Sequence, residues 1–250
     1  MTQQSVKTWI IAAFIAILAF AGISAGAEES GHVAIGVLAT MDREQCLEEW
    51  SETAAFLHQK IPGINFRILP LVYDEIQTAV RDEKVDFILA NPLFYVELES
   101  RYGVNRIATL KNRCLGGACK TYGGVVFWLK KRKDISGIAD LKGKRFMAAN
   151  EHSLGGWLII WRELKEQGLD PYRDFTSLTF GRAHDNVVQA VLEGRTDAGG
   201  VRTDILEYMA AEGKIRLEDF RILPDPAGNQ KTRPYLCSTR EYPEWPMAKL

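Results

Sequence analysis

From His32 onward, short runs rich in β-branched and apolar residues alternate with longer amphipathic stretches. This alternation is typical of α/β folds, in which helices connect the strands of a largely parallel sheet. The first set of elements precedes residue 121. Its predicted strands are Val33–Leu38, Asn65–Leu71, Val85–Ala90 and Arg106–Leu110, and its predicted helices are Arg43–Ile61, Tyr73–Arg81 and Pro92–Tyr102.

A second set of elements follows the same pattern. Its predicted strands are Gly124–Leu129, Arg145–Ala149, Ser177–Gly181 and Ala198–Val201, and its predicted helices are Ser153–Gln167, His184–Glu193 and Arg202–Ala211. We therefore predict two α/β lobes, the first beginning in residues 28–120 and the second formed by residues 121–222. Residues 223–250, with Phe220–Leu223 and Tyr235–Ser238, are expected to cross back to the first lobe, so that two crossovers form a hinge. Pro224, Pro226, Gly228 and Asn229 predict a loop at the return crossover.

The N-terminus has the three parts of a secretory signal. Lys7 precedes the uncharged apolar run Trp9–Ile23, and small residues ending at Ala27 follow it. The run is short for a membrane span, so residues 1–27 are expected to form a signal peptide cleaved before Glu28. An uncleaved membrane anchor is the alternative. Either interpretation predicts a periplasmic location.

Charge and cysteine content limit the other classes. The formal net charge is −1, and it becomes −2 without residues 1–27, which argues against a nucleic-acid-binding protein. Four cysteines remain after the expected cleavage. Cys114 and Cys119 enclose a loop with two glycines and are the preferred disulfide pair, while Cys46 and Cys237 leave other pairings open. A zinc site would usually show C-x2-C pairs, which the sequence lacks.

The junction after the strand ending at Ala149 is the first candidate binding element. Ser153 can cap the helix that begins there, and Leu154, Gly155 and Gly156 form its first turn. Free amide groups and the helix dipole at such an end favour a negatively charged ligand. The alternative is that Ser153 is a plain cap and the glycines serve close packing of the helix on the sheet.

Three further junctions supply candidate ligand contacts. Asn91 can cap a helix with Pro92 at its first position, and Tyr95 follows one turn later. Arg202 can bind an oxyanion with its guanidinium group, next to the hydroxyl of Thr203; the alternative is an Arg202 paired to a surface carboxylate beside a capping Thr203. The weaker candidates are Thr40-Met41-Asp42 and Tyr73-Asp74, whose aspartates are as well explained as helix caps.

Signatures of catalysis are absent from the sequence. The histidines are scattered, and no zinc-protease motif, nucleophile elbow or phosphate loop occurs. His152 and His184 each precede a predicted helix of the second lobe, where they face the cleft or are simply polar loop residues. We expect no metal and no cofactor. A periplasmic enzyme acting on a small anionic substrate is the alternative to a binding protein.

Several motifs together resemble the phosphonate-binding (PhnD-like) branch of the type II periplasmic binding proteins. They are Asp86–Pro92 with Tyr95, Asp140–Lys144, Ser153–Trp157 and Asp197–Asp204. The likeness is closest to the version that serves as the sensing domain of histidine kinases, including the tetrathionate-sensor type. Tyr242–Pro246 is also similar to that group.

The resemblance implies a type II periplasmic-binding-protein fold that closes around a small anionic ligand. It also implies a partner, either the membrane subunits of an ABC transporter or a histidine kinase. One feature departs from the transport-type phosphonate binders, which usually show Ser-x-Ser-Gly where this chain has Ser153-Leu154-Gly155. The missing hydroxyl leaves sulfur oxyanions and phosphate-like groups open alongside phosphonates.

Overall fold

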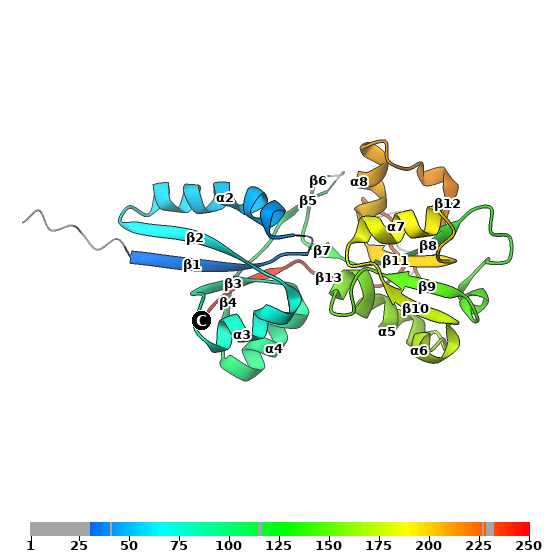
Figure 1. The fold of residues 1–250 in the computed structure, drawn as a ribbon, viewed down its shortest axis with the longest axis horizontal. Coiled ribbons are helices and arrows are strands. Elements are labelled where there is room, and N and C mark those ends of the chain that lie inside the picture. Colours follow the sequence, from blue (N-terminus) through cyan, green and yellow to red (C-terminus); the bar gives the residue numbers. More distant parts are fainter. Residues whose placement is uncertain (1–30, 41, 115–116, 227, 229–232) are drawn as a thin grey trace, which may run out of the picture.

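The computed structural model describes residues 31–40, 42–114, 117–226, 228 and 233–250. The expected signal peptide, and residues 28–30 of the first lobe, lie outside these residues. The described chain forms two α/β lobes side by side along the long axis of the molecule (Figure 1). No helix within the described part of the chain has both the length and the apolar character needed to span a bilayer.

The first lobe is built on a five-stranded sheet with the order β2-β1-β3-β14-β4. Strands β1 (Gly31–Leu38), β2 (Ile64–Leu71) and β3 (Phe87–Leu89) run parallel, and Val37 lies opposite Leu89. Helix α2 (Arg43–Lys60) covers one face. The other face carries the 3-10 turn η1 (Tyr73–Glu75) with helices α3 (Ile76–Arg81) and α4 (Pro92–Tyr102). In Figure 1, α2 lies above the sheet, and α3 and α4 lie below it. Each face has its own apolar core.

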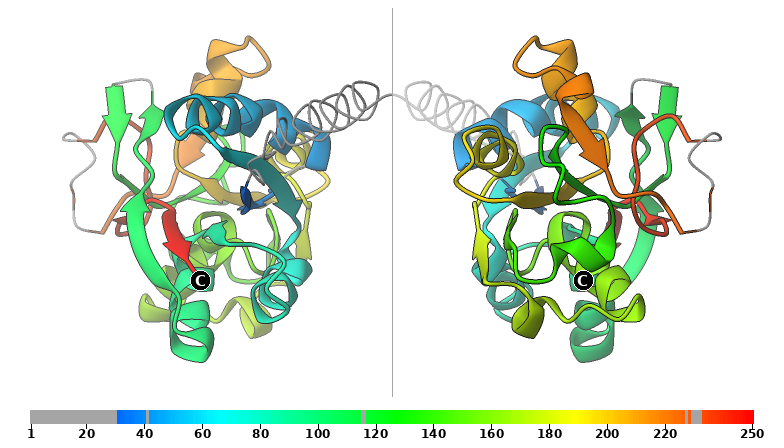
Figure 2. Two further views of the ribbon diagram at one scale, coloured as in Figure 1. Left: turned by 90° about the vertical axis from the view of Figure 1, so that its left-hand side faces the viewer. Right: turned by 90° about the vertical axis from the view of Figure 1, so that its right-hand side faces the viewer.

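Strand β14 (Pro246–Lys249) lies between β3 and β4 (Asn105–Thr109) and is antiparallel to both. Residues 246–249 therefore complete the sheet that begins with residues 31–38. The C-terminus accordingly lies on the first lobe (Figure 1), and the end-on view from the first-lobe side shows it at the end of the red strand β14 (Figure 2, left).

The second lobe repeats this arrangement with the strand order β10-β9-β11-β8-β12. Its strands are β8 (Gly124–Leu129), β9 (Arg145–Ala148), β10 (Ser177–Phe180), β11 (Ala198–Arg202) and β12 (Phe220–Ile222). Strand β9 is parallel to β10 and β11, whereas β8 is antiparallel to β11 and β12. The 3-10 turn η2 (Ile138–Leu141) follows β8, and η4 (Leu217–Asp219) precedes β12.

Helices cover both faces of this second sheet as well. Helix α5 (Ile159–Glu166), entered through the π-helical turn η3 (Leu154–Leu158), and the short helix α6 (Pro171–Asp174) pack on one face around Trp157, Ile160 and Phe175. Helices α7 (His184–Leu192) and α8 (Ile205–Ala211) pack on the other around Val187 and Leu206.

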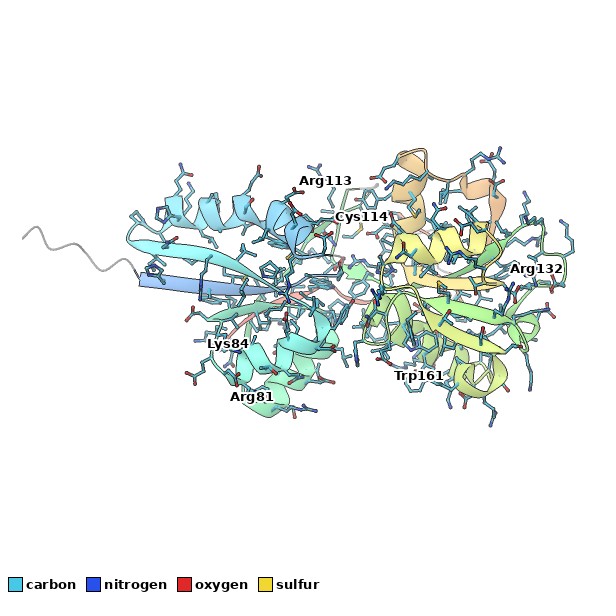
Figure 3. The ribbon with its side chains drawn as sticks, viewed as in Figure 1. Arg81, Lys84, Arg113, Cys114, Arg132 and Trp161 are labelled. Atoms are coloured by element: carbon cyan, nitrogen blue, oxygen red, sulfur yellow. A yellow bond between two sulfur atoms is a disulfide. The ribbon has the colours of Figure 1, made fainter. Side chains whose placement is uncertain are left out.

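The chain crosses between the lobes twice, and the two crossing segments pair with each other. Strand β7 (Thr121–Tyr122) on the outward path is antiparallel to β13 (Tyr242–Pro243) on the return path. On the outward path the hairpin of β5 (Asn112–Cys114) and β6 (Gly117–Cys119) precedes β7, and a disulfide joins Cys114 to Cys119 with the Cα atoms 6.1 Å apart. Figure 3 shows Arg113 and Cys114 at this junction of the lobes.

The return crossover is placed later in the chain than the loop at Pro224–Asn229 suggested, and that expectation is wrong. Leu223 donates its amide to Val126, and Ser238 donates its amide to Gly124 and its side chain bonds the amide of Val126. These bonds hold Leu223 and Ser238 on the second lobe, because they satisfy backbone groups of β8. The crossing occurs only at β13.

Candidate functional site

A cleft of about 470 Å³ lies between the lobes beside the two crossing strands. Its wall is built from the carboxyl ends of the parallel strands of both sheets, which is where ligands of open α/β sheets bind. The end of β1 supplies Thr40, the end of β2 Tyr73 and the end of β3 Asn91. The second lobe supplies Ser153 after β9, His184 after β10, and Arg202 with Asp204 at the end of β11.

The start of the Ser153 helix is a widened turn with unused amide groups. The Ser153 side chain accepts a hydrogen bond from the amide of Gly156 at 3.2 Å, and the Ser153 carbonyl accepts from both Trp157 and Leu158. The amides of Leu154 and Gly155 have no hydrogen-bond partner among the described residues, and both residues line the cleft. Since the first amides of a helix point out of its N-terminal end, these two are free to donate to a ligand.

Asn91 faces this turn from the first lobe with its donor group available. Its Oδ1 accepts hydrogen bonds from the amides of Leu93 and Phe94, so it caps α4. Its side-chain amide group is therefore directed away from the helix, and the residue lines the cleft although only 3% of it is exposed.

Tyr73 connects the two lobes near the same place. Its ring centroid lies 6.4 Å from that of His152 in the second lobe. Burial raises the pKa of the Tyr73 phenol, and the neighbouring Ser153 hydroxyl opposes that shift. The phenol therefore stays protonated at neutral pH and is a hydrogen-bond donor in the cleft.

Arg202 is held by both crossing strands. Its guanidinium carbon lies 4.3 Å from the ring centroid of Tyr122, next to the outward crossing. Its Nη2 lies 2.5 Å from Oε1 of Glu244, a carboxylate on the return path whose side chain is fully buried. Burial lowers the pKa of Arg202, but the negative charges of Glu244 and Asp204 outweigh it and keep the pKa above its ordinary value. Arg202 is a paired cation rather than a free one.

Two titratable groups beside Arg202 have strongly shifted pKa values. Burial, with the charge of Arg202 adding to it, lowers the pKa of His184 to about 4, so this imidazole is neutral at pH 7. Burial also raises the pKa of Asp204 to about 6. Its Oδ1 lies 3.8 Å from the Arg202 Nε, and its backbone has a left-handed φ of 73°.

The two glycines of the helix start are required by close packing. A Cβ atom on Gly155 would lie 2.8 Å from the Tyr122 ring, and one on Gly156 would lie 2.7 Å from the His184 imidazole. Both distances are too short for real contacts. The glycines let the helix tip approach the outward crossing and the neighbouring helix.

Seven of the ten candidate contact residues line the cleft, and three do not. Those that do are Tyr73, Asn91, Ser153, Leu154, Gly155, His184 and Arg202. Tyr95 instead donates its hydroxyl to Glu99 on the outside of α4. Gly156 lies beneath His184, and the buried Thr203 ties β11 to the hinge through hydrogen bonds with Gly123.

Sequence reasoning missed Glu244, Tyr122 and Asp204 as the surroundings of Arg202. Glu244 lies within the Tyr242–Pro246 segment, where only the likeness to a family drew notice. Asp204, two positions after Arg202, was a visible signal, but no role was predicted for it from the sequence. Further lining residues outside the candidate set are Trp50, Asn112, Arg113, Tyr208 and Trp245.

The sequence model of one family matches residues 35–249; its description is "ABC transporter, phosphonate, periplasmic substrate-binding protein". The chain belongs to this family. It is therefore a PhnD-like substrate-binding domain of extracytoplasmic type.

A curated relative is the tetrathionate sensor histidine kinase TtrS of Salmonella typhimurium, 32% identical over 239 residues. The match covers 94% of this chain and 39% of the kinase, so the chain spans well under half of that relative's length.

Two solved structures share the fold at low sequence identity. One is a binding-protein component of an ABC phosphonate transporter from Pseudomonas aeruginosa, with a TM-score of 0.66, 15% identity, and coverage of 88% of this chain and 68% of that one. The other is PhnD1 from Prochlorococcus marinus in complex with methylphosphonate, with a TM-score of 0.67, 16% identity, and coverage of 88% and 76%. These likenesses support the two-lobed type II periplasmic-binding-protein fold.

Proposed function

We propose that the protein captures a small anion between its lobes and closes around it by bending at the β7–β13 crossing. The observation that carries this proposal is the meeting of hydrogen-bond donors from both lobes at one place in the cleft. The amides of Leu154 and Gly155 come from the second lobe, and the side chains of Asn91 and Tyr73 come from the first. A ligand that accepts from both lobes favours the closed state, because only that state offers both sets of bonds.

The charges of the lining are mixed, with Asp42, Glu49 and Asp204 beside two arginines, so we expect hydrogen bonds to hold the anion more than net charge does. The carboxylates of Asp42 and Glu49 both accept hydrogen bonds from Gln45 at the start of α2. The guanidinium groups of Arg113 and Arg202 also line the cleft. Sulfur oxyanions, phosphate and phosphonates are the ligand classes that this set of donors suits.

A thermal-shift screen of the purified protein tests the ligand class. The panel contains phosphate, methylphosphonate, sulfate, thiosulfate and tetrathionate, with neutral glycerol and cationic arginine as controls. A true ligand at 100 times its Kd stabilises the folded state by about 2.7 kcal/mol. A saturable rise in Tm with at least one anion is expected. A response to arginine, with none to any anion, would overturn the anion proposal.

We propose further that the protein binds its ligand without altering it. The family is one of binding proteins, and this membership is what supports the proposal. Mass analysis of the anion after prolonged incubation checks this. Recovery of unchanged anion is expected, and a converted product would favour the enzyme alternative.

Two partners fit a domain of this kind: the membrane subunits of an ABC transporter and a histidine kinase. We propose the kinase, since the relative that matches 94% of this chain is a sensor kinase. The test replaces the matching segment of the Salmonella kinase with this chain and measures a reporter of kinase output. Output that changes with a small anion is expected; a silent chimera that still binds the anion would favour the transporter.

We also propose export by residues 1–27, acting as a cleaved signal peptide. N-terminal sequencing of the periplasmic protein is expected to begin at Glu28. An intact N-terminus in the membrane fraction would identify the segment as an anchor.

A further inference from the structure

The pairing of Arg202 with Glu244 has a consequence for ligand capture. Arg202 is a cleft-lining guanidinium, yet its charge is already neutralised by a carboxylate of the same chain at 2.5 Å. Its second nitrogen, Nη1, lies 3.4 Å from Glu244 Oε2, so both ends of the carboxylate face the guanidinium. An anion that enters the cleft meets an arginine that has an internal counter-ion.

Asp204 is a second and more distant counter-ion of Arg202, and the other groups packed against the guanidinium carry no charge. Tyr122 presents its ring, His184 is neutral and accepts from the Arg202 amide at 3.4 Å, and Asp204 lies at 3.8 Å. Glu244 is thus the group against which an incoming anion competes for the hydrogen-bonding face of the guanidinium.

Glu244 is also well placed to report the outcome of that competition. It lies directly between β13 and Trp245, whose side chain packs on the cores of the first lobe. Its amide donates to the Lys120 carbonyl on the outward crossing, and its carboxylate accepts from Asn112 at 3.4 Å. Arg202 belongs to β11 of the second lobe. The ion pair therefore ties the second lobe to the return crossing.

We infer that Glu244 is a built-in competitor for Arg202, so that an anion in the cleft takes the guanidinium from Glu244 and releases the return crossing from the second lobe. This inference rests on the proposed capture of an anion. The exchange sets the affinity, because the ligand must replace an existing ion pair. It also links occupancy to the hinge, because a buried carboxylate that loses its cation has to move or find another donor.

The test compares inorganic phosphate binding, by calorimetry and by Tm, in the unaltered protein and in Glu244→Gln. Glutamine keeps the volume and an acceptor oxygen but removes the competing charge. We expect phosphate to bind at least about tenfold more tightly to Glu244→Gln. Arg202→Met combined with Glu244→Gln is expected to lose the whole gain. Equal affinity in Glu244→Gln and the unaltered protein, or a gain that survives in the double variant, would overturn the inference.

Glu241→Gln is the matched control. Glu241 lies three residues earlier and bonds Arg233 and Thr121, away from Arg202, so its loss changes the net charge equally and should leave phosphate affinity unaltered. A similar gain in Glu241→Gln would show a mere net-charge effect. Phosphate binding by Glu244→Gln, with no anion bound by the unaltered protein, would contradict the proposed function and leave the competition intact. Phosphate binding by the unaltered protein that is no tighter in Glu244→Gln would support the proposed function and overturn the competition.

Hydrogen exchange provides the readout for the hinge. In Glu244→Gln without ligand, the backbone amides of Tyr242, position 244 and Trp245 are expected to exchange several-fold faster than in the unaltered protein, because the pair no longer ties the crossing to Arg202. Unchanged exchange there would overturn the link between the ion pair and the hinge.

Discussion

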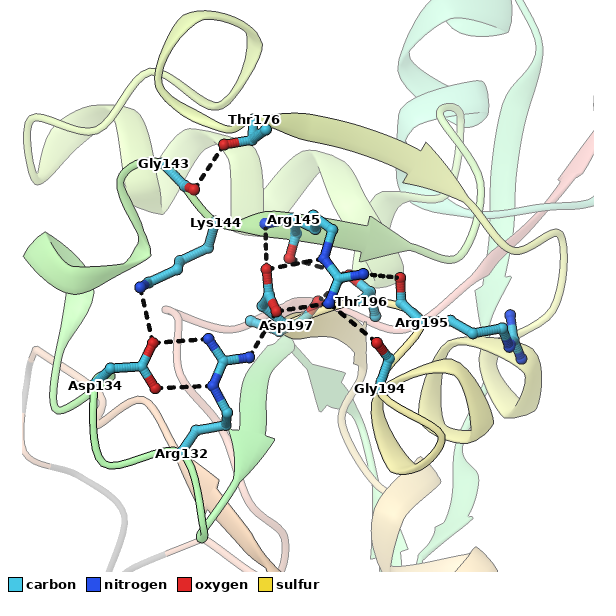
Figure 4. Close-up of polar contacts among 11 residues, drawn as sticks. Arg132, Asp134, Gly143, Lys144, Arg145, Thr176, Gly194, Arg195, Thr196 and Asp197 are labelled. Atoms are coloured by element: carbon cyan, nitrogen blue, oxygen red, sulfur yellow. Dashed lines mark hydrogen bonds and ion pairs between the residues drawn. The ribbon is translucent and has the colours of Figure 1, made fainter.

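Strand β11 carries an ion-pair cluster at each end, and the two clusters differ in almost every physical respect. Asp197, just before the strand, bonds Arg145 and Arg132 on the outer end of the second lobe, and Asp134 and Lys144 extend this network (Figure 4). Arg202, at the other end, has Glu244 and Asp204 as its charged neighbours. The outer arginine Arg145 has 45% of its side chain exposed, compared with 14% for Arg202.

The difference in exposure and in hydrogen bonding indicates which cluster can bind a ligand. In the outer network, Arg145 donates to the carbonyls of Gly194 and Arg195 as well as to Asp197, so its donors are used within the protein. Its bonds hold the pKa of Asp197 well below the usual range. At the cleft, burial shifts the pKa of Asp204 in the opposite direction. The outer cluster stabilises the lobe, whereas the cleft cluster contains the ion pair that we propose a bound anion displaces.

The largest expected effect is at the cleft end. Arg202→Met leaves the buried Glu244 carboxylate without its cation, which should cost about 3–5 kcal/mol of unfolding free energy and weaken anion binding. Denaturant unfolding measures the first and calorimetry the second. Adding Glu244→Gln to Arg202→Met should restore stability but not binding. A loss below about 1 kcal/mol in Arg202→Met would make this pair equivalent to a surface ion pair.

The next largest effect is expected at Gly156 beside the cleft, and Gly137, which lies away from the cleft, provides the comparison. Gly156→Ala forces a Cβ against His184, Ala149 and Ser153 at less than 3 Å, and should destabilise the protein by about 2–3 kcal/mol. Gly137→Ala, in the loop after β8, meets nothing within 4 Å and is expected to be neutral or slightly stabilising. Similar Tm values for the two variants would show that the helix tip can move away from α7.

Asp204→Asn tests the opposite pKa shifts of the two aspartates. A folded-state pKa of about 6, above the ordinary 3.8, means that Asp204 lowers stability as the pH rises between those values. Asparagine removes this penalty, so the variant should be more stable by about 1–2 kcal/mol at pH 7 and equal to the unaltered protein below pH 4. Unfolding curves across this range check it. The Asp197 carboxyl has the reverse sign, with stability that is lost as the pH falls.

The smallest effect is expected at the outer end. Arg145→Met leaves Asp197 paired with Arg132 at 2.6 Å, and should cost no more than about 1 kcal/mol. The difference from the unaltered protein should shrink in 0.5 M salt, because exposed ion pairs are screened. A larger loss of unfolding free energy that does not depend on salt would show that the outer network contributes to stability as a buried ion pair does.

Most elements of the fold were visible in the sequence because each follows from local patterning. The helix beginning at Pro92 and the strand from Gly124 to Leu129 have the predicted bounds. The helix expected from Arg202 begins later, at Ile205, because Arg202 continues strand β11 and Asp204 takes a left-handed conformation. That conformation depends on packing around the hinge, which no local pattern reveals.

Only those residues of the candidate site that directly follow a strand could be predicted from the sequence. Ser153 and Asn91 were found because a cap after a strand is a local signal. The partners of Arg202 were not, since Glu244 is 42 positions away and Tyr122 comes from the other crossing. Such contacts arise from topology, and a return crossing that had been expected near Pro224 could not bring Glu244 into consideration.

The place of β14 within the first sheet affects how the chain can fold during synthesis. Its pairing partners β3 and β4 are made about 160 and about 140 residues earlier than β14 itself, so the N-terminal sheet remains two separate pieces until β14 has been synthesised. The second lobe, by contrast, has all its strands within one continuous segment. It is expected to become protease-resistant first on the nascent chain, and the lobe begun earliest should be completed last.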